Sequence, residues 1–264
     1  MLVDSHCHLD FPDFAQELDA VVGRGRAAGI GRFVTISTKV RKHGDLIAIA
    51  ERFPDVFCSV GTHPHYADQE LDIGTADLVE RTRHPKVVAI GEAGLDYHYD
   101  NSPRDAQEQG FRAHIAAARE TKLPLVIHAR EADDDVLKIL REETGKGPFP
   151  AVLHCFTGGR ELAFGAVELG LYVSFTGILT YKKTDELRAI ARDLPAERVL
   201  VETDAPYLAP GKFRGKRCEP AYLVETAKVM AEVRGVSPDE IARQTTDNFF
   251  RLFSKVPRPA AVAA

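Results

Sequence analysis

The chain of 264 residues is poor in cysteine, in basic segments and in long apolar runs. Its four cysteines (Cys7, Cys58, Cys155 and Cys218) include no CxxC pair and are too few for a disulfide scaffold, so we expect a reducing, cytoplasmic setting. No apolar stretch approaches the roughly 20 residues that span a bilayer. The first residues lack the basic and apolar segments of a signal peptide. We therefore expect neither export nor a membrane partner.

Positive charge is not in excess either. The 34 lysines and arginines stand against 39 acidic residues, and the net charge of −5 argues against a protein that wraps nucleic acid along an extended basic surface. A small active site for a phosphodiester is compatible with this charge. Hydrophobic residues make up 44% of the chain and charged residues 28%, which excludes global disorder.

Short apolar runs alternate with amphipathic segments along the chain. Several runs are continuous stretches of Val, Ile and Leu, which is typical of strands buried on both faces. Strands are predicted over residues 2–8, 33–37, 57–61, 87–91, 125–128, 151–154, 171–174 and 199–202. Helices are predicted over residues 14–28, 104–121, 185–192, 221–234 and 238–253.

Eight such strand–helix units predict an α/β protein, a single-domain (β/α)8 TIM barrel with a C-terminal helical extension. A doubly wound sheet is the alternative for an alternating pattern. That fold favours a glycine-rich turn after the first strand, and the segment SHCHLDFPD contains no glycine. We expect the barrel to occupy residues 1–255 and residues 256–264 to form a flexible C-terminal tail.

Metal-binding side chains stand at the C-terminal ends of five predicted strands. This is the face that carries the active site in such barrels. His6 and His8 point the same way, because residues two apart on a strand share a face. The other four are Glu92 after the fourth strand, His128 on the fifth, His154 on the sixth and Asp204 after the eighth.

Six ligands are enough for two ions, with a carboxylate bridging them. Three or four ligands suffice for one catalytic ion, and Glu92 lies between the two sets of histidines. Two divalent ions about 4 Å apart can clamp both oxygens of a displacement at phosphorus and lower the pKa of a bound water toward about 7. Histidine and carboxylate ligands allow Mg, Mn or Zn and do not choose between them.

Longer motifs resemble one known family. The stretches DSHCHLD (4–10), GTHPH (61–65), PLVIHAR (124–130) and LHCFTGG (153–159), with GEAGLDYHYDNSPRDAQEQGF (91–111) and ETDAPYLAP (202–210), are similar to the TatD family of metal-dependent hydrolases, which are amidohydrolase-like TIM barrels. Many amidohydrolases share the HxH pair. The GE-x-GLDY and ETDAPYL segments are far more specific.

The resemblance implies a divalent-metal-dependent deoxyribonuclease, often a 3′→5′ exonuclease acting on single-stranded ends. It implies that Asp204 and Glu92 are catalytic, with Asp204 both a ligand and the base for the attacking water. One departure is Cys218, which stands where members commonly have Asn, so the role of that position is open. The implied ligand sets are His6, His8, Glu92 and Asp204 for one ion, and Glu92, His128 and His154 for the second.

Three residues near the predicted mouth are candidate substrate contacts. The resemblance makes His63 a substrate or phosphate contact. For His65, fixing its loop is a nearly equal alternative. Arg130 follows His128 by two residues and could hold a phosphate bidentately. Pairing with a nearby carboxylate is an equal alternative for Arg130.

The segment after the eighth strand supplies two more candidates, Tyr207 and Arg214. Four cations in residues 211–217 with a nearby aromatic ring suit a single strand of nucleic acid, with its phosphates neutralised and a base stacked on Tyr207. A solvated loop is the alternative interpretation.

The leading hypothesis is a monomeric metal-dependent phosphodiesterase acting on DNA ends. The main alternative is an ester or amide hydrolase on the same two-metal scaffold, such as a D-aminoacyl-tRNA deacylase or a small-molecule amidohydrolase. Fold and metal do not separate the two, because function depends on the contacts within the site. A non-catalytic binding barrel is disfavoured, since all six ligand positions are intact.

Overall fold

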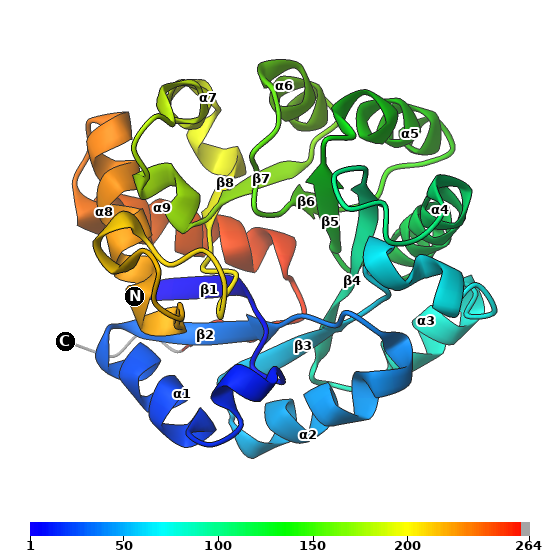
Figure 1. Ribbon diagram of the computed structural model, residues 1–264, viewed down its shortest axis with the longest axis horizontal. Helices are drawn as coiled ribbons and strands as arrows, with labels where there is room; N and C mark the ends of the chain where they lie inside the picture. Colours follow the sequence, from blue (N-terminus) through cyan, green and yellow to red (C-terminus); the bar gives the residue numbers. More distant parts are fainter. Residues whose placement is uncertain (260–264) are drawn as a thin grey trace.

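Eight parallel strands follow one another around a ring in chain order (Figure 1). The computed structural model describes residues 1–259. A parallel bridge between Cys7 and Ala205 links the two ends of the sheet, which makes the barrel nearly closed. The strands are β1 (Leu2–Cys7), β2 (Ile30–Thr35), β3 (Val56–Val60), β4 (Val87–Asp96), β5 (Leu125–Arg130), β6 (Ala151–Leu153), β7 (Tyr172–Phe175) and β8 (Val199–Val201).

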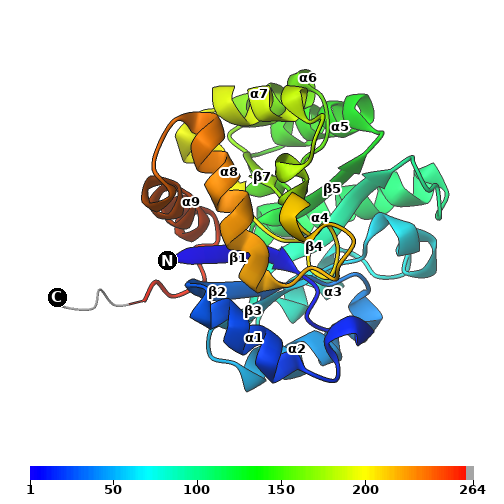
Figure 2. The same cartoon turned by 60° about the vertical axis from the view of Figure 1, so that its left-hand side comes forward.

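Helices surround this ring (Figure 1). They are α1 (Leu18–Ala27), α2 (His43–Arg52), α3 (Thr75–Arg81), α4 (Arg104–Thr121), α5 (Asp133–Gly145), α6 (Arg160–Glu168), α7 (Asp185–Asp193) and α8 (Leu223–Arg234). A further helix, α9 (Pro238–Leu252), lies on the side where β1 begins (Figure 2). The predicted (β/α)8 barrel with a C-terminal helical extension is confirmed. Within residues 1–259, no helix is long and apolar enough to cross a membrane.

Apolar side chains are buried in two layers, one on each face of the strands. The outer layer lies between the strands and the ring of helices and includes Phe33 and Phe111. The inner layer fills the barrel, where Val34 packs in the same cluster as Phe249 and Phe253 from the region of α9. Because α9 covers the N-terminal end of the barrel with aromatic rings, the opposite end is the one open to ligands.

Strand ends differ from the sequence prediction. The sequence predicts that the fourth strand ends at Gly91, whereas β4 continues to Asp96. Gly91 and Gly94 lie within the strand at φ 108° and 153°, a backbone conformation that glycine adopts without strain. At the other end of the sheet, β1 ends at Cys7 and β8 at Val201, so the last predicted residues of these strands lie in the loops beyond.

The structure differs from the prediction near both ends of the chain. The predicted helix over residues 14–28 is instead a 3-10 turn, Pro12–Phe14, followed by α1. At the C-terminus, Val256 is buried in the inner layer and Arg258 pairs with Asp247. Residues 260–264 lie outside the described part of the chain, and the division at residue 255 stays a prediction.

Gly61, directly after β3, allows β4 to approach closely beside Glu92. A Cβ at position 61 would overlap the backbone of Gly91, which cannot rotate away as a side chain could. We expect Gly61→Ala to lower the free energy of unfolding by about 1–3 kcal/mol, as other overpacked sites do. Urea denaturation measures this change.

Gly23 in α1 provides a matched control. An added Cβ there has no atom within 4 Å, and the position is exposed. Gly23→Ala should therefore stabilise the protein by about 0.5–1 kcal/mol. Equal effects at the two positions would contradict a steric role for Gly61.

Candidate metal centre

The six side chains predicted as metal ligands converge at the C-terminal mouth of the barrel. A cavity of about 630 Å³ opens there, and His6 lies fully buried among the other five ligand candidates. The loops after the strands complete the site. The predicted ligands that line the cavity are His8, Glu92, His128, His154 and Asp204.

A first group of donor atoms gathers around one point. His6 Nε2 lies 3.2 Å from His8 Nε2, 3.4 Å from Glu92 Oε2 and 3.4 Å from Asp204 Oδ1. His8 Nε2 is also 3.4 Å from Asp204 Oδ1. Ligands at about 2.1 Å from one tetrahedral ion are spaced about 3.4 Å apart, so these distances suit the edges of a coordination shell.

The second oxygen of Glu92 faces a second group. Glu92 Oε1 lies 2.8 Å from His128 Nδ1 and 2.7 Å from His154 Nε2, and these two nitrogens are 3.4 Å apart. Glu92 therefore presents one oxygen to each group, and its side chain is only 2% exposed. This is the placement that a bridging carboxylate requires.

Each histidine has a second ring nitrogen, and the hydrogen bond made there determines whether the nitrogen facing Glu92 carries a proton or a free lone pair. Three of the histidines have an oxygen acceptor next to the nitrogen that faces away from Glu92. Such an acceptor holds the N–H on that side and leaves the inner nitrogen free as a ligand. The pairs are His8 Nδ1 with the Ile36 carbonyl at 3.1 Å, His128 Nε2 with Asp96 at 3.1 Å and His154 Nδ1 with Glu202 at 3.3 Å.

His63 has the opposite arrangement. Its Nδ1 accepts the backbone N–H of His65 at 3.1 Å, so the proton stands on Nε2, which lies 3.5 Å from Glu92 Oε1. His63 is therefore placed as a hydrogen-bond donor toward the centre. One ring nitrogen of His63 nonetheless lies within 4.8 Å of a ligand atom of Glu92 and of a ring nitrogen of His128. The same spacing holds for the sets His6, His8, Glu92 and His6, His154, Glu202.

The centre buries negative charge with histidine as its only cationic partner. In the described residues, no lysine or arginine lies within 4 Å of the carboxylates of Glu92, Asp96, Glu202 or Asp204. A buried charge is costly unless it is paired. Among the remaining groups only the histidines, a proton or a bound cation can provide that pairing.

The pKa values show the same demand for positive charge. Burial acts to lower the pKa of His154, but Glu92 and Glu202 raise it well above its ordinary value. Burial acts to raise the pKa of Glu92, but His154 and His63 hold it well below its ordinary value. A divalent cation would neutralise these carboxylates and accept the histidine lone pairs without added protons, so the donor set fits such an ion.

Asp96 and Glu202 are site residues that the sequence analysis did not assign. Asp96 Oδ2 accepts from His65 Nε2 at 2.8 Å as well as from His128, and its pKa is lowered by these contacts against the effect of burial. Glu202 accepts the backbone N–H of Cys155 at 2.6 Å. Both lie inside the quoted motifs, so a search for acidic partners of the histidines could have found them.

The predicted substrate contacts divide into two sets. His63, His65, Arg130 and Tyr207 line the cavity, and the Arg130 guanidinium lies over the Tyr99 ring at 4.7 Å. The structure places the Arg214 guanidinium 4.7 Å from the Tyr181 ring, outside the lining of the cavity. The contact role of each of these residues stays a prediction.

Neighbours of Arg214 in the loop between β8 and α8 are held by other elements. Arg217 pairs with Glu17 at 2.8 Å. The Cys218 side chain is fully buried beside Glu219, so this position does not reach the cavity. Replacement of the family's usual Asn by Cys218 therefore affects packing behind the loop.

Comparisons with known proteins identify the family to which the chain is similar. The family model described as TatD related DNase matches residues 3–254. The uncharacterized metal-dependent hydrolase YabD of Bacillus subtilis (strain 168) is 39% identical over 253 residues, covering 96% of this chain and 99% of that protein. The 3′-5′ ssDNA/RNA exonuclease TatD of Salmonella typhimurium is 35% identical over 260 residues, covering 97% and 100%.

A solved structure shares the whole architecture. The crystal structure of YjjV, a TatD homologue from Escherichia coli K12, superposes with a TM-score of 0.89 at 30% identity, covering 97% of this chain and 98% of that one. A parallel barrel with histidines and carboxylates at its mouth defines the class of metal-dependent hydrolases. Within that class, the chain belongs to the TatD family, and the resemblance carried by its motifs is confirmed.

His114 in α4 holds the loop that carries His63. Its Nε2 accepts the backbone N–H of Thr62 at 3.0 Å, and its Nδ1–H donates to the Gly110 carbonyl at 2.7 Å. Burial lowers the pKa of His114 to about 4. An unfolded histidine titrates near 6.5, so the unfolded chain binds the proton more tightly between these values. Stability from His114 is complete above pH 6.5 and is lost as the pH falls toward 4.

The variant His114→Gln tests this linkage, because an amide oxygen can accept the Thr62 N–H without titrating. From pH 7.5 to pH 5, wild type should lose roughly 2 kcal/mol more unfolding free energy than the variant. His43, whose pKa burial also lowers to about 4, contributes equally to both proteins. Identical losses in urea denaturation would show that His114 does not couple folding to protons.

Proposed function

We propose that the protein is a two-metal phosphodiesterase that removes nucleotides from single-stranded DNA ends in the 3′→5′ direction. The observation that carries this proposal is Glu92, whose two oxygens face two separate groups of donor atoms. The name of the Salmonella relative, a 3′-5′ ssDNA/RNA exonuclease, supports the substrate and the polarity. All six proposed ligands come from one chain, which supports a monomer, and we place it in a reducing cytoplasm.

The six converging side chains would hold two divalent ions, Mg, Mn or Zn. Ions in such a site supply Lewis acidity and neutralise charge on the phosphoryl oxygens. The outer partners Asp96 and Glu202 keep His128 and His154 in the tautomers that a ligand needs. The proposed sets are His6, His8, Glu92 and Asp204 for one ion, and Glu92, His128 and His154 for the other.

Asp204 is the proposed base for the attacking water. Its backbone has φ 58°, a left-handed conformation that Asp tolerates better than most residues. Its N–H donates to the His6 carbonyl at 2.9 Å, which brings the carboxylate from the end of β8 to the end of β1. The side chain is 13% exposed, so a water in the cavity can reach it. Together with Glu92, it forms the proposed catalytic pair.

The cavity wall supplies groups for the substrate. His63 can donate its Nε2–H to a phosphate oxygen, since its other nitrogen is already an acceptor. His65 and Arg130 line the same wall, and Tyr207 stands at the rim on the other side. Arg214, in the loop after β8, would attract the strand from outside the cavity.

Substitution separates the two proposed catalytic roles. Glu92→Ala removes a ligand from both groups and should abolish binding of both ions. Asp204→Asn keeps an oxygen at the site and should retain most metal while hydrolysis falls at least about 100-fold, as expected for loss of a general base. Metal content by plasma emission and initial rates measure the two effects. Full activity in Asp204→Asn would refute its assignment as the base.

The function itself is tested on single-stranded DNA labelled at its 3′ or its 5′ end. Metal-stripped protein should be inactive, and added Mg or Mn should restore release of mononucleotides. Early release of the 3′ label would establish the polarity. Asp204→Asn is the matched control, because it should preserve the fold and most of the metal.

Lack of hydrolysis with any of these metals would contradict the proposal. The same scaffold would then be tested on carboxylic esters and amides, beginning with deacylation of D-aminoacyl-tRNA. Hydrolysis of these substrates in place of DNA would identify the site as an ester or amide hydrolase.

A further inference from the structure

The exposed aromatic rings of the protein gather at one place. Among the described residues, five large hydrophobic side chains are exposed: Met1, Leu71, Tyr99, Tyr207 and Val236. The two aromatic ones, Tyr99 and Tyr207, are each 54% exposed, and both line the cavity above the proposed metal centre. Apolar rings left in water beside a polar cavity are typical of a binding surface.

The two rings stand on opposite sides of that cavity. Tyr99 follows β4 and Tyr207 follows β8, and these strands are four places apart in an eight-stranded ring. The two strands therefore face each other across the barrel. The same two segments carry the acids on which the proposed chemistry depends, because Glu92 lies within β4 and Asp204 lies in the loop after β8.

A backbone hydrogen bond ties each tyrosine to an acidic residue of the site. The Tyr99 N–H donates to Asp96 Oδ1 at 2.9 Å, and Asp96 in turn accepts from His128. The Tyr207 N–H donates to the Asp204 carbonyl, also at 2.9 Å. In both loops the ring is three residues beyond the acid. The two rings are thus fixed relative to the centre between them.

Neighbouring rings orient both tyrosines. Tyr207 meets Phe11 at 82°, with ring centroids 5.9 Å apart. Tyr99 meets His65 at 89°, with centroids 5.3 Å apart, and the Arg130 guanidinium lies over its ring. Perpendicular contacts of this kind hold a ring in place while the exposed half remains available for stacking.

We propose that Tyr99 and Tyr207 are two stacking platforms that separate the bases on either side of the scissile phosphate. This inference rests on the proposed function. Stacking on aromatic side chains is the usual way in which proteins hold unpaired bases, and it tolerates any sequence. Bases within a duplex are already stacked on each other, so the last two nucleotides must be unpaired to reach both platforms.

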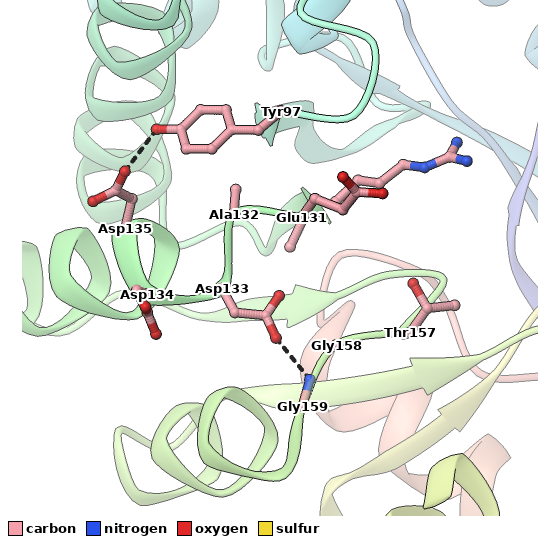
Figure 3. A pocket seen from close by; sticks show the side chains of 11 residues that line it. Tyr97, Glu131, Ala132, Asp133, Asp134, Asp135, Thr157, Gly158 and Gly159 are labelled. Atoms are coloured by element: carbon pink, nitrogen blue, oxygen red, sulfur yellow. Dashed lines mark hydrogen bonds between the residues drawn. The ribbon is translucent and has the colours of Figure 1, made fainter.

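Charge indicates which platform receives the terminal base. Beyond Arg130 a second cavity of about 740 Å³ adjoins the first, and the two share Ala129, Arg130 and Thr157. Figure 3 shows carboxylates around it from the loop before α5 and from the first turn of that helix. They belong to Glu131, Asp133, Asp134 and Asp135.

A continuing strand would carry its phosphates past these four carboxylates, which repel them. On the other side, the loop after Tyr207 carries Lys212, Arg214 and Lys216, which attract phosphates. The strand therefore ends at Tyr99 and continues outward past Tyr207. Tyr99 takes the 3′-terminal base, and Tyr207 takes the base before it.

Fluorescence tests the two positions separately. The probe is a single-stranded oligonucleotide with a phosphorothioate at its last linkage and 2-aminopurine as either the last or the penultimate base. Wild type should quench both probes, because stacking quenches 2-aminopurine. Tyr99→Ala should lose quenching at the last base only, and Tyr207→Ala at the penultimate base only. In steady-state hydrolysis each variant should raise KM about tenfold with little change in kcat.

Controls separate stacking from other effects. Tyr99→Phe and Tyr207→Phe keep the ring and should behave as wild type. Leu71→Ala removes an exposed apolar side chain that does not line the metal-centre cavity, and it should change neither quenching nor KM. Unchanged circular dichroism would show that the variants fold.

Two results would overturn the platforms while leaving the proposed function intact. Wild type could hydrolyse DNA while both alanine variants keep full quenching and KM. Alternatively, each variant could lose quenching equally at both bases, which would remove the separation into two platforms. If wild type neither binds nor hydrolyses the DNA, the proposed function itself fails and the inference fails with it.

Discussion

The site depends on burying carboxylates where, among the described residues, no lysine or arginine lies close enough to neutralise them. Glu92 is at the middle of this arrangement, with an oxygen toward each group of histidine nitrogens. An unpaired buried carboxylate would destabilise the barrel, and a lysine partner would occupy the site permanently. Histidines avoid both outcomes, because they are neutral ligands when a cation is present and proton carriers otherwise. The same residues thus reconcile stability with metal binding.

The barrel makes this concentration of charge possible. Its inner layer of aliphatic side chains is covered at the N-terminal end by the rings of Phe249 and Phe253, so only the opposite end can admit ligands and solvent. Glycines at positions 61 and 91 let the backbones of neighbouring strands come close enough to bring Glu92 among the histidines. Supporting contacts such as that from His114 to Thr62 then fix the loops around the mouth.

Much of the fold and of the candidate site can be predicted from local pattern. Continuous aliphatic runs predict strands buried on both faces, and the HxH spacing places His6 and His8 on the same side of a strand. Strand ends are predicted less well. Glycine usually interrupts a strand and so predicts an end at Gly91, whereas the pairing of β4 with β5 carries the strand on to Asp96. Asp96 was missed for that reason.

The sequence by itself determined the family, the (β/α)8 barrel and the six residue types that meet at its mouth. The family follows from the resemblance of whole motifs such as ETDAPYLAP (202–210), whereas the barrel and the ligand positions depend on periodicity and spacing. All of these are properties of the chain taken in order. The tertiary structure alone decided which oxygen of Glu92 faces which histidines, that His63 points an N–H inward, and that Tyr99 stands across the barrel from Tyr207. These relations join residues 29 to 108 positions apart. They arise only when the sheet closes, because closure sets the distance and orientation between strands that never meet along the sequence.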